Sequence, residues 1–272
     1  MKIKIVENLF CLWNRLPLWF GFFISKLIGR LMCSPFTRVF ITPYCWLNGI
    51  SSDEKSRFTP PNDFTNYDSF SSFFIRKLSD GNPKGAAPFW PCDGKLVDCY
   101  AGPIRNTSKV KKDRADLSEI FLPRYAPLSR NEAFLNIFLS NVDYHRVHSP
   151  IDGRIVRVTV VPGKLVVLRS WSYGEEPSYP AMTNSRINIE ISQSNGDTWY
   201  MSLVSGPGVA EIHIDRSVLI GSRVSAGQEI AHFKIGSTVC IIVPLGLDGR
   251  DQINLSKSTV RANTPMLKYD LR

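Results

Sequence analysis

The sequence has 272 residues and lacks the cysteine spacings and long apolar runs that mark several common protein classes. Its six cysteines form no CxxC pair and no zinc-ligand pattern, which favours free thiols in a reducing compartment. The most apolar run, residues 16–24, contains Pro17 and is far shorter than the roughly 20 residues that span a bilayer. No small-residue cleavage site follows this run, so it is also a poor candidate for a secretory signal.

Acidic residues are scarce in the first fifty positions, where six lysines and arginines face a single acid, Glu7. Trp13, Trp19, Trp46 and several phenylalanines lie among these cations. Such a mixture is typical of proteins that bind nucleic acid or an anionic membrane surface. The bulky Leu, Ile and Phe residues favour lipid, so we expect amphipathic helices in the membrane interface and no nucleic-acid partner. The alternative is a helical cap packed on the protein's own core.

The next part of the chain contains a connector, a short helix and a repeated motif. Residues 51–66 are polar and include Pro60-Pro61, whereas residues 67–76 predict a short amphipathic helix with its phenylalanines in the core. Pro-x-Asp-Gly occurs at 91–94 and again at 150–153, each time before an alternating strand, which predicts two related β units. Turn capping explains both Asp93 and Asp152, and the pattern alone does not say which of them is chemical.

Two of the four histidines, His145 and His148, stand three residues apart beside Arg146. A zinc site needs more ligands than this segment offers, so we expect no metal. Proton transfer suits the pair better, because imidazole titrates near neutral pH. The simpler alternative, two polar residues in a loop before Pro150, stays open at this point.

The second half of the chain predicts β structure, with a strand-like run at 133–140 and further strands at 154–161, 165–168, 187–192, 198–204 and 208–214. Residues 171–183 predict a long aromatic loop. Residues 221–233 predict strand, tight turn and strand, and 238–243 a buried strand. The Gly236-Ser237 bond therefore falls between two strands, which we expect to share one sheet. His213 and His232 have no evident partners and are interpreted as structural.

Gly236-Ser237-Thr238 offers a specific chemistry. Glycine tolerates a strained backbone and leaves its carbonyl open, and the serine hydroxyl follows directly. Attack by the Ser237 oxygen converts the amide to an ester, and elimination cuts the chain and leaves dehydroalanine. Loss of ammonia then gives a pyruvoyl group. Taken alone, however, this tripeptide is common in ordinary turns.

Three motifs in order give the segment a context: Asp93 in its Pro-x-Asp-Gly turn, residues 144–150 (Tyr-His-Arg-Val-His-Ser-Pro), and residues 233–239 with Gly-Ser-Thr-Val at their end. Together with the 67–76 helix they resemble the phosphatidylserine decarboxylase family over nearly the whole chain. The resemblance implies that Asp93, His148 and Ser237 form a Ser-His-Asp set that drives self-cleavage. It also implies that His145 serves in decarboxylation, and it selects Asp93 over Asp152.

The sequence departs from the family pattern at three places. Ile235 stands where Leu is usual, a nearly isosteric change. Residues 204–206 read Val-Ser-Gly where many members have Val-Gly-Ala, which bears on the substrate pocket. Asn263 stands where Gly is frequent, and asparagine tolerates a positive φ.

The resemblance implies an α+β protein with a helical membrane-associating region and linker at 1–66 and a β-rich catalytic domain of hammerhead-like β units at 67–272. Cleavage between 236 and 237 would give a β chain, 1–236, and an α chain, 237–272, which associate as a heterodimer; a higher homo-oligomer stays open. The covalent pyruvoyl group from Ser237 would form a Schiff base with phosphatidylserine and release CO2 and phosphatidylethanolamine. The enzyme would bind an anionic membrane surface peripherally, at the cytoplasmic face of the cell membrane.

Two other functions are compatible with parts of the sequence. A soluble relative would decarboxylate a free amino acid by the same chemistry, and the N-terminal fifty residues are what distinguishes it. A biotinyl- or lipoyl-type carrier needs a lysine at a hairpin tip. Lys164 follows Pro-Gly in the wrong surroundings, and the Ala226-Gly227 turn has no lysine.

Overall fold

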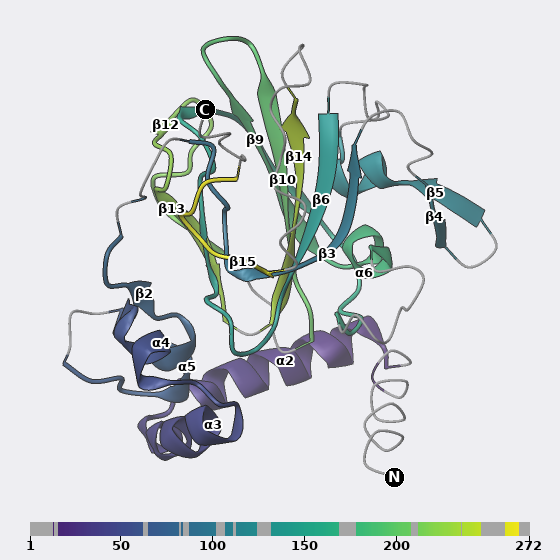
Figure 1. Ribbon diagram of the computed structural model, residues 1–272. Coiled ribbons are helices and arrows are strands. Elements are labelled where there is room, and N and C mark those ends of the chain that lie inside the picture. The colour runs from purple at the N-terminus through teal and green to yellow at the C-terminus, as the bar shows by residue number, and fades with distance from the viewer. Residues whose placement is uncertain are drawn as a thin grey trace.

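The computed structural model describes residues 13, 16–61, 65–81, 83, 87–101, 107–110, 113–123, 132–168, 178–207, 212–234, 236–245 and 259–266. It contains helices and antiparallel sheets, which confirms the predicted α+β class. The first part of the chain forms α2 (Leu18–Met32), η1 (Pro35–Phe40), α3 (Ile41–Leu47), α4 (Ser52–Ser56) and α5 (Phe70–Phe74). These helices lie below the sheets in Figure 1.

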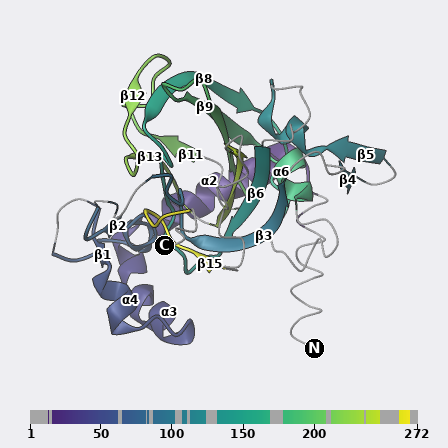
Figure 2. The same ribbon diagram turned by 45° about the horizontal axis from the view of Figure 1, so that its top comes forward.

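Eight strands form one antiparallel sheet in the order β12-β8-β9-β10-β14-β6-β3-β15. Their bounds are β3 (Gly94–Ala101), β6 (Glu132–Leu139), β8 (Gly153–Val161), β9 (Arg186–Ser192), β10 (Thr198–Val204), β12 (Arg223–Val224), β14 (Ser237–Pro244) and β15 (Thr259–Val260). Figure 2 shows that the sheet is strongly curved. Strand β14 is central and pairs with β10 on one side and β6 on the other.

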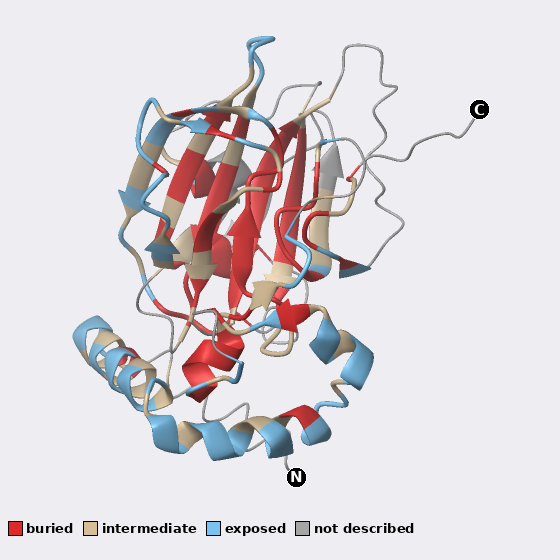
Figure 3. Cartoon of the chain, turned by 90° about the vertical axis from the view of Figure 1, so that its left-hand side faces the viewer, coloured by how far each residue is buried: buried red, intermediate tan, exposed pale blue. Residues whose placement is uncertain are grey.

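A second sheet of three strands, β11 (Ile212–Ile214), β13 (Glu229–Phe233) and β7 (Arg146–His148), contributes to the same core. Alternate residues of the large sheet, such as Ile189 and Ile241, are buried in one cluster with Val147, Ile230 and Phe233 of the smaller sheet. In Figure 3 the buried residues run through the middle of the strands. This alternation is what a sheet with one face on the core requires.

The opposite face of the large sheet carries a smaller apolar cluster. Phe134 and Ile242 pack there with Ile120 and Phe121 of η2 (Leu117–Phe121) and with Ala181 of α6 (Tyr179–Thr183). Two short two-stranded sheets complete the described structure: β1 (Phe58–Thr59) with β2 (Lys77–Leu78), and β4 (Thr107–Val110) with β5 (Asp113–Asp116).

The two Pro-x-Asp-Gly motifs open equivalent units, as the repetition predicts. Each motif leads into a long strand of the large sheet, β3 or β8, and each aspartate accepts a backbone hydrogen bond from a distant turn. Asp93 accepts from the amide of Ala262 at 2.8 Å, and Asp152 accepts from the amide of Ala226 at 2.9 Å. The two motifs are also joined through the residues that precede them. The amide of His148 donates to the carbonyl of Pro91, and the amide of Phe89 donates to the carbonyl of Pro150.

The two distant turns are equivalent in backbone conformation as well. Gly227 has φ +82° in one turn, and Asn263 has φ +59° at the matching place in the other. Both residues donate their amides to the segment before a motif, Gly227 to Ser149 and Asn263 to Trp90. Asparagine at 263 thus meets the positive φ that its position requires.

Most predicted strands are confirmed within one or two residues, but the strand at 165–168 is wrong. These residues are buried without forming a strand, apart from an isolated bridge at Lys164. The side chain of Asn184 replaces a partner strand: it accepts from the amide of Val166 and donates to the carbonyl of the same residue, both at 2.9 Å. Part of the loop predicted at 171–183 is also wrong, because α6 begins at Tyr179; residues 169–177 lie outside the described structure.

The expectation that one sheet contains both strands beside Gly236-Ser237 is wrong. Strand β13, before the bond, belongs to the three-stranded sheet, whereas β14, after it, belongs to the large sheet. The bond therefore lies where the chain passes from one sheet to the other. The predicted strand at 208–214 is described only as β11, because residues 208–211 lie outside the described structure.

Helix α2 buries two small residues and exposes several of its large apolar side chains. Gly21 and Ser25 are buried, whereas Trp19, Phe23 and Leu27 are 71%, 59% and 44% exposed. Together with Leu18 and Leu31 they form an exposed apolar stripe, and further exposed apolar residues follow in η1 and α3: Phe36, Val39, Phe40, Trp46 and Leu47. A helix that folds only against its own protein has the reverse arrangement. Among the described residues, no helix is both long and apolar enough to cross a bilayer.

Candidate active site

Ser237 is the first residue of β14 and is fully buried. Among the described residues, its hydroxyl has no hydrogen-bond partner. Buried hydroxyl groups are nearly always paired, because an unpaired one loses its bonds to water without replacement. The hydroxyl of Ser202 on β10 is likewise buried without a described partner, but of the two only Ser237 directly follows a glycine carbonyl that it could attack.

Gly236 lies in a tightly packed part of the chain. A Cβ at this position would lie 2.8 Å from Oδ1 of Asn141. The backbone of Gly206 approaches from another segment, so that a Cβ on Gly206 would lie 3.3 Å from the Gly236 carbonyl oxygen and 2.6 Å from Leu168. Because neither Gly206 nor Gly236 has a Cβ, their two segments can approach closely around the Gly236-Ser237 bond.

The ring of His145 is fully buried and held at one nitrogen only. Its Nδ1 lies 2.8 Å from the carbonyl oxygen of Asp143. Because a carbonyl can only accept, Nδ1 carries the proton and Nε2 carries a lone pair. Nε2 has no partner among the described residues, and the ring packs on Phe74 at 4.2 Å between centroids. Burial lowers the pKa of His145 to about 3, so the ring is neutral at physiological pH.

His148 is bonded at both ring nitrogens. Nδ1 lies 2.8 Å from the carbonyl of Gly227, and Nε2 lies 2.9 Å from the phenol oxygen of Tyr144. Burial lowers the pKa of His148 and raises that of Tyr144, so both groups are neutral. The phenol therefore donates to Nε2, the nitrogen that would take a proton from a serine.

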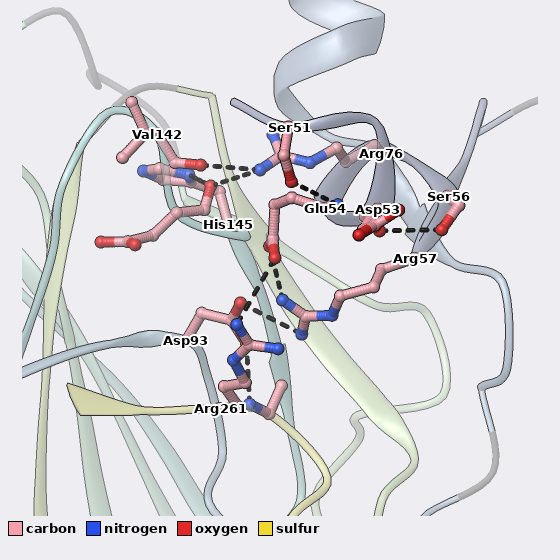
Figure 4. A network of polar contacts seen from close by, with 12 residues as sticks. Ser51, Asp53, Glu54, Ser56, Arg57, Arg76, Asp93, Val142, His145 and Arg261 are labelled. Atoms are coloured by element: carbon pink, nitrogen blue, oxygen red, sulfur yellow. Dashed lines mark hydrogen bonds and ion pairs between the residues drawn. The ribbon is translucent and has the colours of Figure 1, made fainter. Parts of the chain in front are cut away.

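Asp93 is buried beside a cation from the connector. One carboxylate oxygen accepts the Ala262 amide, and the other lies 3.4 Å from Nη2 of Arg57. Burial raises the pKa of Asp93, while Arg57 and the Ala262 amide oppose that shift. Arg57 also pairs with Glu54, which in turn contacts Arg261 (Figure 4). By contrast, Asp152 is exposed, so the two equivalent aspartates differ in burial and in their cationic neighbour.

The four residues implied by the resemblance lie on neighbouring segments. The amide of His148 donates to Pro91 at 2.8 Å, and the amide of Phe233 donates to the carbonyl of His145 at 2.9 Å. The described residues show no hydrogen bond between the side chains of Asp93, His148 and Ser237. In the uncut chain His148 is bonded to Tyr144 and Gly227 instead, so the Ser-His-Asp set stays a prediction.

Arg146, within the same motif, has a structural role. Its guanidinium forms a close ion pair with Glu229 and donates to the carbonyl oxygens of Ile75 and Arg76. It thereby ties the end of α5 to β7 and β13. Glu229 also lies 3.8 Å from His232, whose ring packs on His213 at 4.6 Å between centroids.

Sequence reasoning did not identify several residues of this region. Arg57 lies in a segment interpreted only as a polar connector, although it forms an ion pair with Asp93. Phe58 follows it and stacks on Tyr144 at 5.4 Å. Arg76 donates to the carbonyl of Asp143, which also accepts from His145. Their sequence signal is a single charged or aromatic residue in a polar connector or at the end of a short predicted helix, which is too common to be decisive.

Comparison with known proteins gives this arrangement a family context. A sequence model described as phosphatidylserine decarboxylase matches residues 70–266. The phosphatidylserine decarboxylase proenzyme of Methylobacillus flagellatus is 29% identical over 67% of this chain and 71% of its own length. The proenzyme of the same name from Marinobacter nauticus is 26% identical over 92% of this chain and 94% of its own. The Bacillus cereus proenzyme is 26% identical over 82% and 83%, respectively.

Proposed function

Because this chain belongs to the phosphatidylserine decarboxylase family, we propose that it cuts itself at Gly236-Ser237 and then converts phosphatidylserine to phosphatidylethanolamine and CO2. The family makes it a carboxy-lyase. The observation that carries the self-cleavage is the buried Ser237 hydroxyl, which has no described partner and directly follows the tightly packed Gly236. The relatives' designation as proenzymes supports a precursor that is processed.

Self-cleavage uses the chain's own atoms until a final hydrolysis by water. The Ser237 oxygen adds to the Gly236 carbonyl carbon, the C–N bond breaks, and the freed amine takes a proton, which leaves an ester. Elimination removes the Cα proton of Ser237 and releases residues 1–236 as a carboxylate. The resulting dehydroalanine tautomerises to an imine, and water hydrolyses it to a ketone and ammonia.

The residues at this position fit a pyruvoyl group. Ser237 would become the N-terminus of the α chain, and the oxygen that is lost forms no hydrogen bond with any described residue. The group would supply an electrophilic ketone that takes the substrate amine and accepts the electron pair released with CO2.

The proposed roles of the other residues follow from their environments. His148 is the base for self-cleavage, and Asp93 is the carboxylate that would orient it. His148 must exchange its bond to Tyr144 for one to Ser237. His145 is neutral and its Nε2 has no partner among the described residues, so this nitrogen can hold a proton and return it to the substrate carbon.

The two chains would stay together after the cut. Strand β14 lies between β10 and β6, which both come from residues 1–236. Strand β15 likewise pairs with β3. These backbone ladders support a heterodimer of the 1–236 and 237–272 chains. We also propose that residues 1–66 form the membrane-associating region and 67–272 the catalytic domain.

The exposed stripe on α2 favours a lipid substrate over a free amino acid. Trp19, Phe23 and Leu27 would insert into the interface, while Lys26 and Arg30 on the same helix are exposed for contact with anionic headgroups. Binding would be peripheral, at a cell membrane.

The test is an assay of the purified full chain with phosphatidylserine in mixed micelles and, separately, with free serine. We expect phosphatidylethanolamine and CO2 from the lipid, no turnover of serine, and no activity in Ser237→Ala. Turnover of serine alone would replace this proposal with the amino-acid decarboxylase.

A further inference from the structure

A pocket of about 290 Å³ lies among α3, the connector and α5. Its wall includes Cys45 of α3, Phe58 of β1, and Tyr67 and Phe73 at α5. The volume is near the lower end of the range for small-molecule sites, and a mostly apolar wall with few polar groups is typical of them. None of the described residues that line the pocket is acidic, whereas two of them, Lys55 and Arg76, are cationic.

Arg76 is a buried cation without a carboxylate partner among the described residues. Only 3% of it is exposed, and its guanidinium packs over the rings of Phe58 and Phe73 at 4.4 and 5.1 Å. Three carboxylates lie near Arg76 but are bonded to other groups: Glu54 and Asp93 to Arg57, and Asp143 to the amide of Ser140. A buried charge is costly unless it is paired, so this site favours an anionic ligand.

The guanidinium also has unused donors. Of its five N–H groups, one donates to the Phe73 carbonyl and two to the carbonyls of Val142 and Asp143. The Nε–H and one Nη1–H have no described partner. Arginine donors of this kind match the oxygens of a phosphate, and Lys55, an exposed pocket residue, adds a second cation.

The pocket adjoins the proposed site through one carbonyl group. The Asp143 carbonyl oxygen accepts from Nη2 of Arg76 at 3.1 Å and from Nδ1 of His145 at 2.8 Å. Figure 4 shows the Arg76 guanidinium bonded to the Val142 carbonyl, with His145 nearby. Phe73 lines the pocket, and the next residue, Phe74, packs on the His145 ring.

We propose that this pocket binds the phosphodiester and glycerol of a phospholipid, with Arg76 as the buried phosphate partner and Lys55 as the outer one. The apolar wall would contact the glycerol and the first methylenes. The proposal rests on the proposed function for the identity of the lipid. It assigns Arg76 and Lys55 as binding residues and places the serine headgroup of the substrate towards His145.

The test uses Ser237→Ala as an uncut full chain, so that neither self-cleavage nor turnover affects the result. The probe is dihexanoyl-phosphatidylglycerol below its micelle concentration, which has the phosphodiester and tails but no reactive amine. Calorimetric titration should show saturable binding. Two variants should each weaken binding by about tenfold or more: Thr42→Trp, which places a bulky side chain at an exposed position of the pocket wall, and Lys55→Gln, which removes the outer cation.

Thr259→Trp is the matched control, because Thr259 is exposed on β15 and does not line the pocket; it should bind the probe like the parent. Glycerol 3-phosphate should bind much more weakly than the lipid. Equal affinity for glycerol 3-phosphate would overturn the lipid assignment. Absence of saturable binding, or equal affinity in Thr42→Trp, would overturn the pocket itself. A failure of self-cleavage in the native chain would instead reject the proposed function and leave this titration unaffected.

Discussion

The phenol oxygen of Tyr144 lies 2.9 Å from Nε2 of His148, while Nδ1 of the same ring lies 2.8 Å from the Gly227 carbonyl. The carbonyl fixes the proton on Nδ1, and the protonated phenol donates to Nε2. Tyr144 thus stabilises the neutral ring and covers the nitrogen that would act as the base.

Tyr144→Phe should therefore raise the pKa of His148, because the lost hydrogen bond favours only the neutral imidazole. Self-cleavage that needs neutral His148 would then reach half its maximal rate at a higher pH. The measurement is the rate at which two fragments appear in newly synthesised protein, as a function of pH. Tyr44→Phe is the control, because its phenol donates to the Asn141 carbonyl and not to a histidine. An unchanged pH midpoint in Tyr144→Phe would contradict this role.

The equivalent glycines of the two repeated units should be intolerant of alanine. A Cβ at Gly94 would lie 2.6 Å from the Phe138 carbonyl oxygen, and one at Gly153 would lie 2.8 Å from that of Ser192. Either Gly→Ala change should lower the free energy of unfolding by about 1–3 kcal/mol in urea titrations of uncut Ser237→Ala. Gly81→Ala, where a Cβ meets no atom within 4 Å, should change it by less than about 0.5 kcal/mol. Equal effects at all three positions would refute the steric argument.

Burial of neutral His145 should make stability depend on pH. The folded pKa is about 3 and the unfolded pKa is about 6.5, so between these values the unfolded state binds the extra proton. The free energy of unfolding therefore falls as the pH is lowered below about 6.5, by up to about 1.4 kcal/mol per pH unit for this one group. His145→Gln should reduce the slope between pH 6.5 and 5, measured by urea titration in the uncut chain. His148 acts in the same direction, so some slope should remain; an identical slope would count against a buried neutral His145.

Membrane binding should depend on the apolar stripe of α2. The triple change Trp19→Ser, Phe23→Ser and Leu27→Ser removes large exposed side chains and should abolish flotation of the full chain with anionic vesicles. The matched control replaces three other exposed apolar residues, Val160, Leu219 and Ile220, with serine and should float like the parent. Flotation that survives the first triple change would show that α2 is not the anchor.

Local patterns predicted the strands and the repeated turns because each needs only neighbouring residues. The strand at 198–204 has the bounds of β10, and the buried run at 133–140 matches β6 within one residue. The positive φ at Asn263 agrees with the family resemblance, because glycine is frequent at this position and asparagine tolerates a positive φ. These features depend on side-chain alternation and on backbone strain, which a short segment already fixes.

Contacts between distant segments could not be read in the same way. An asparagine side chain at 184 satisfies the backbone of Val166, so a strand-like run at 165–168 forms no strand. Strands β13 and β14 belong to different sheets because each pairs with strands from other parts of the chain. The ion pair of Arg57 with Asp93 joins residues 36 positions apart. None of these contacts can be predicted from the residues next to them in the sequence.

The central claim is that Gly236-Ser237 breaks itself and creates a ketone at residue 237. The most direct test is the intact mass of the purified full chain, followed by reaction with a hydrazine. Two fragments, 1–236 and a hydrazine-reactive 237–272, are the predicted result, and Ser237→Ala should remain a single unreactive chain. One unbroken native chain without a reactive carbonyl would contradict the account.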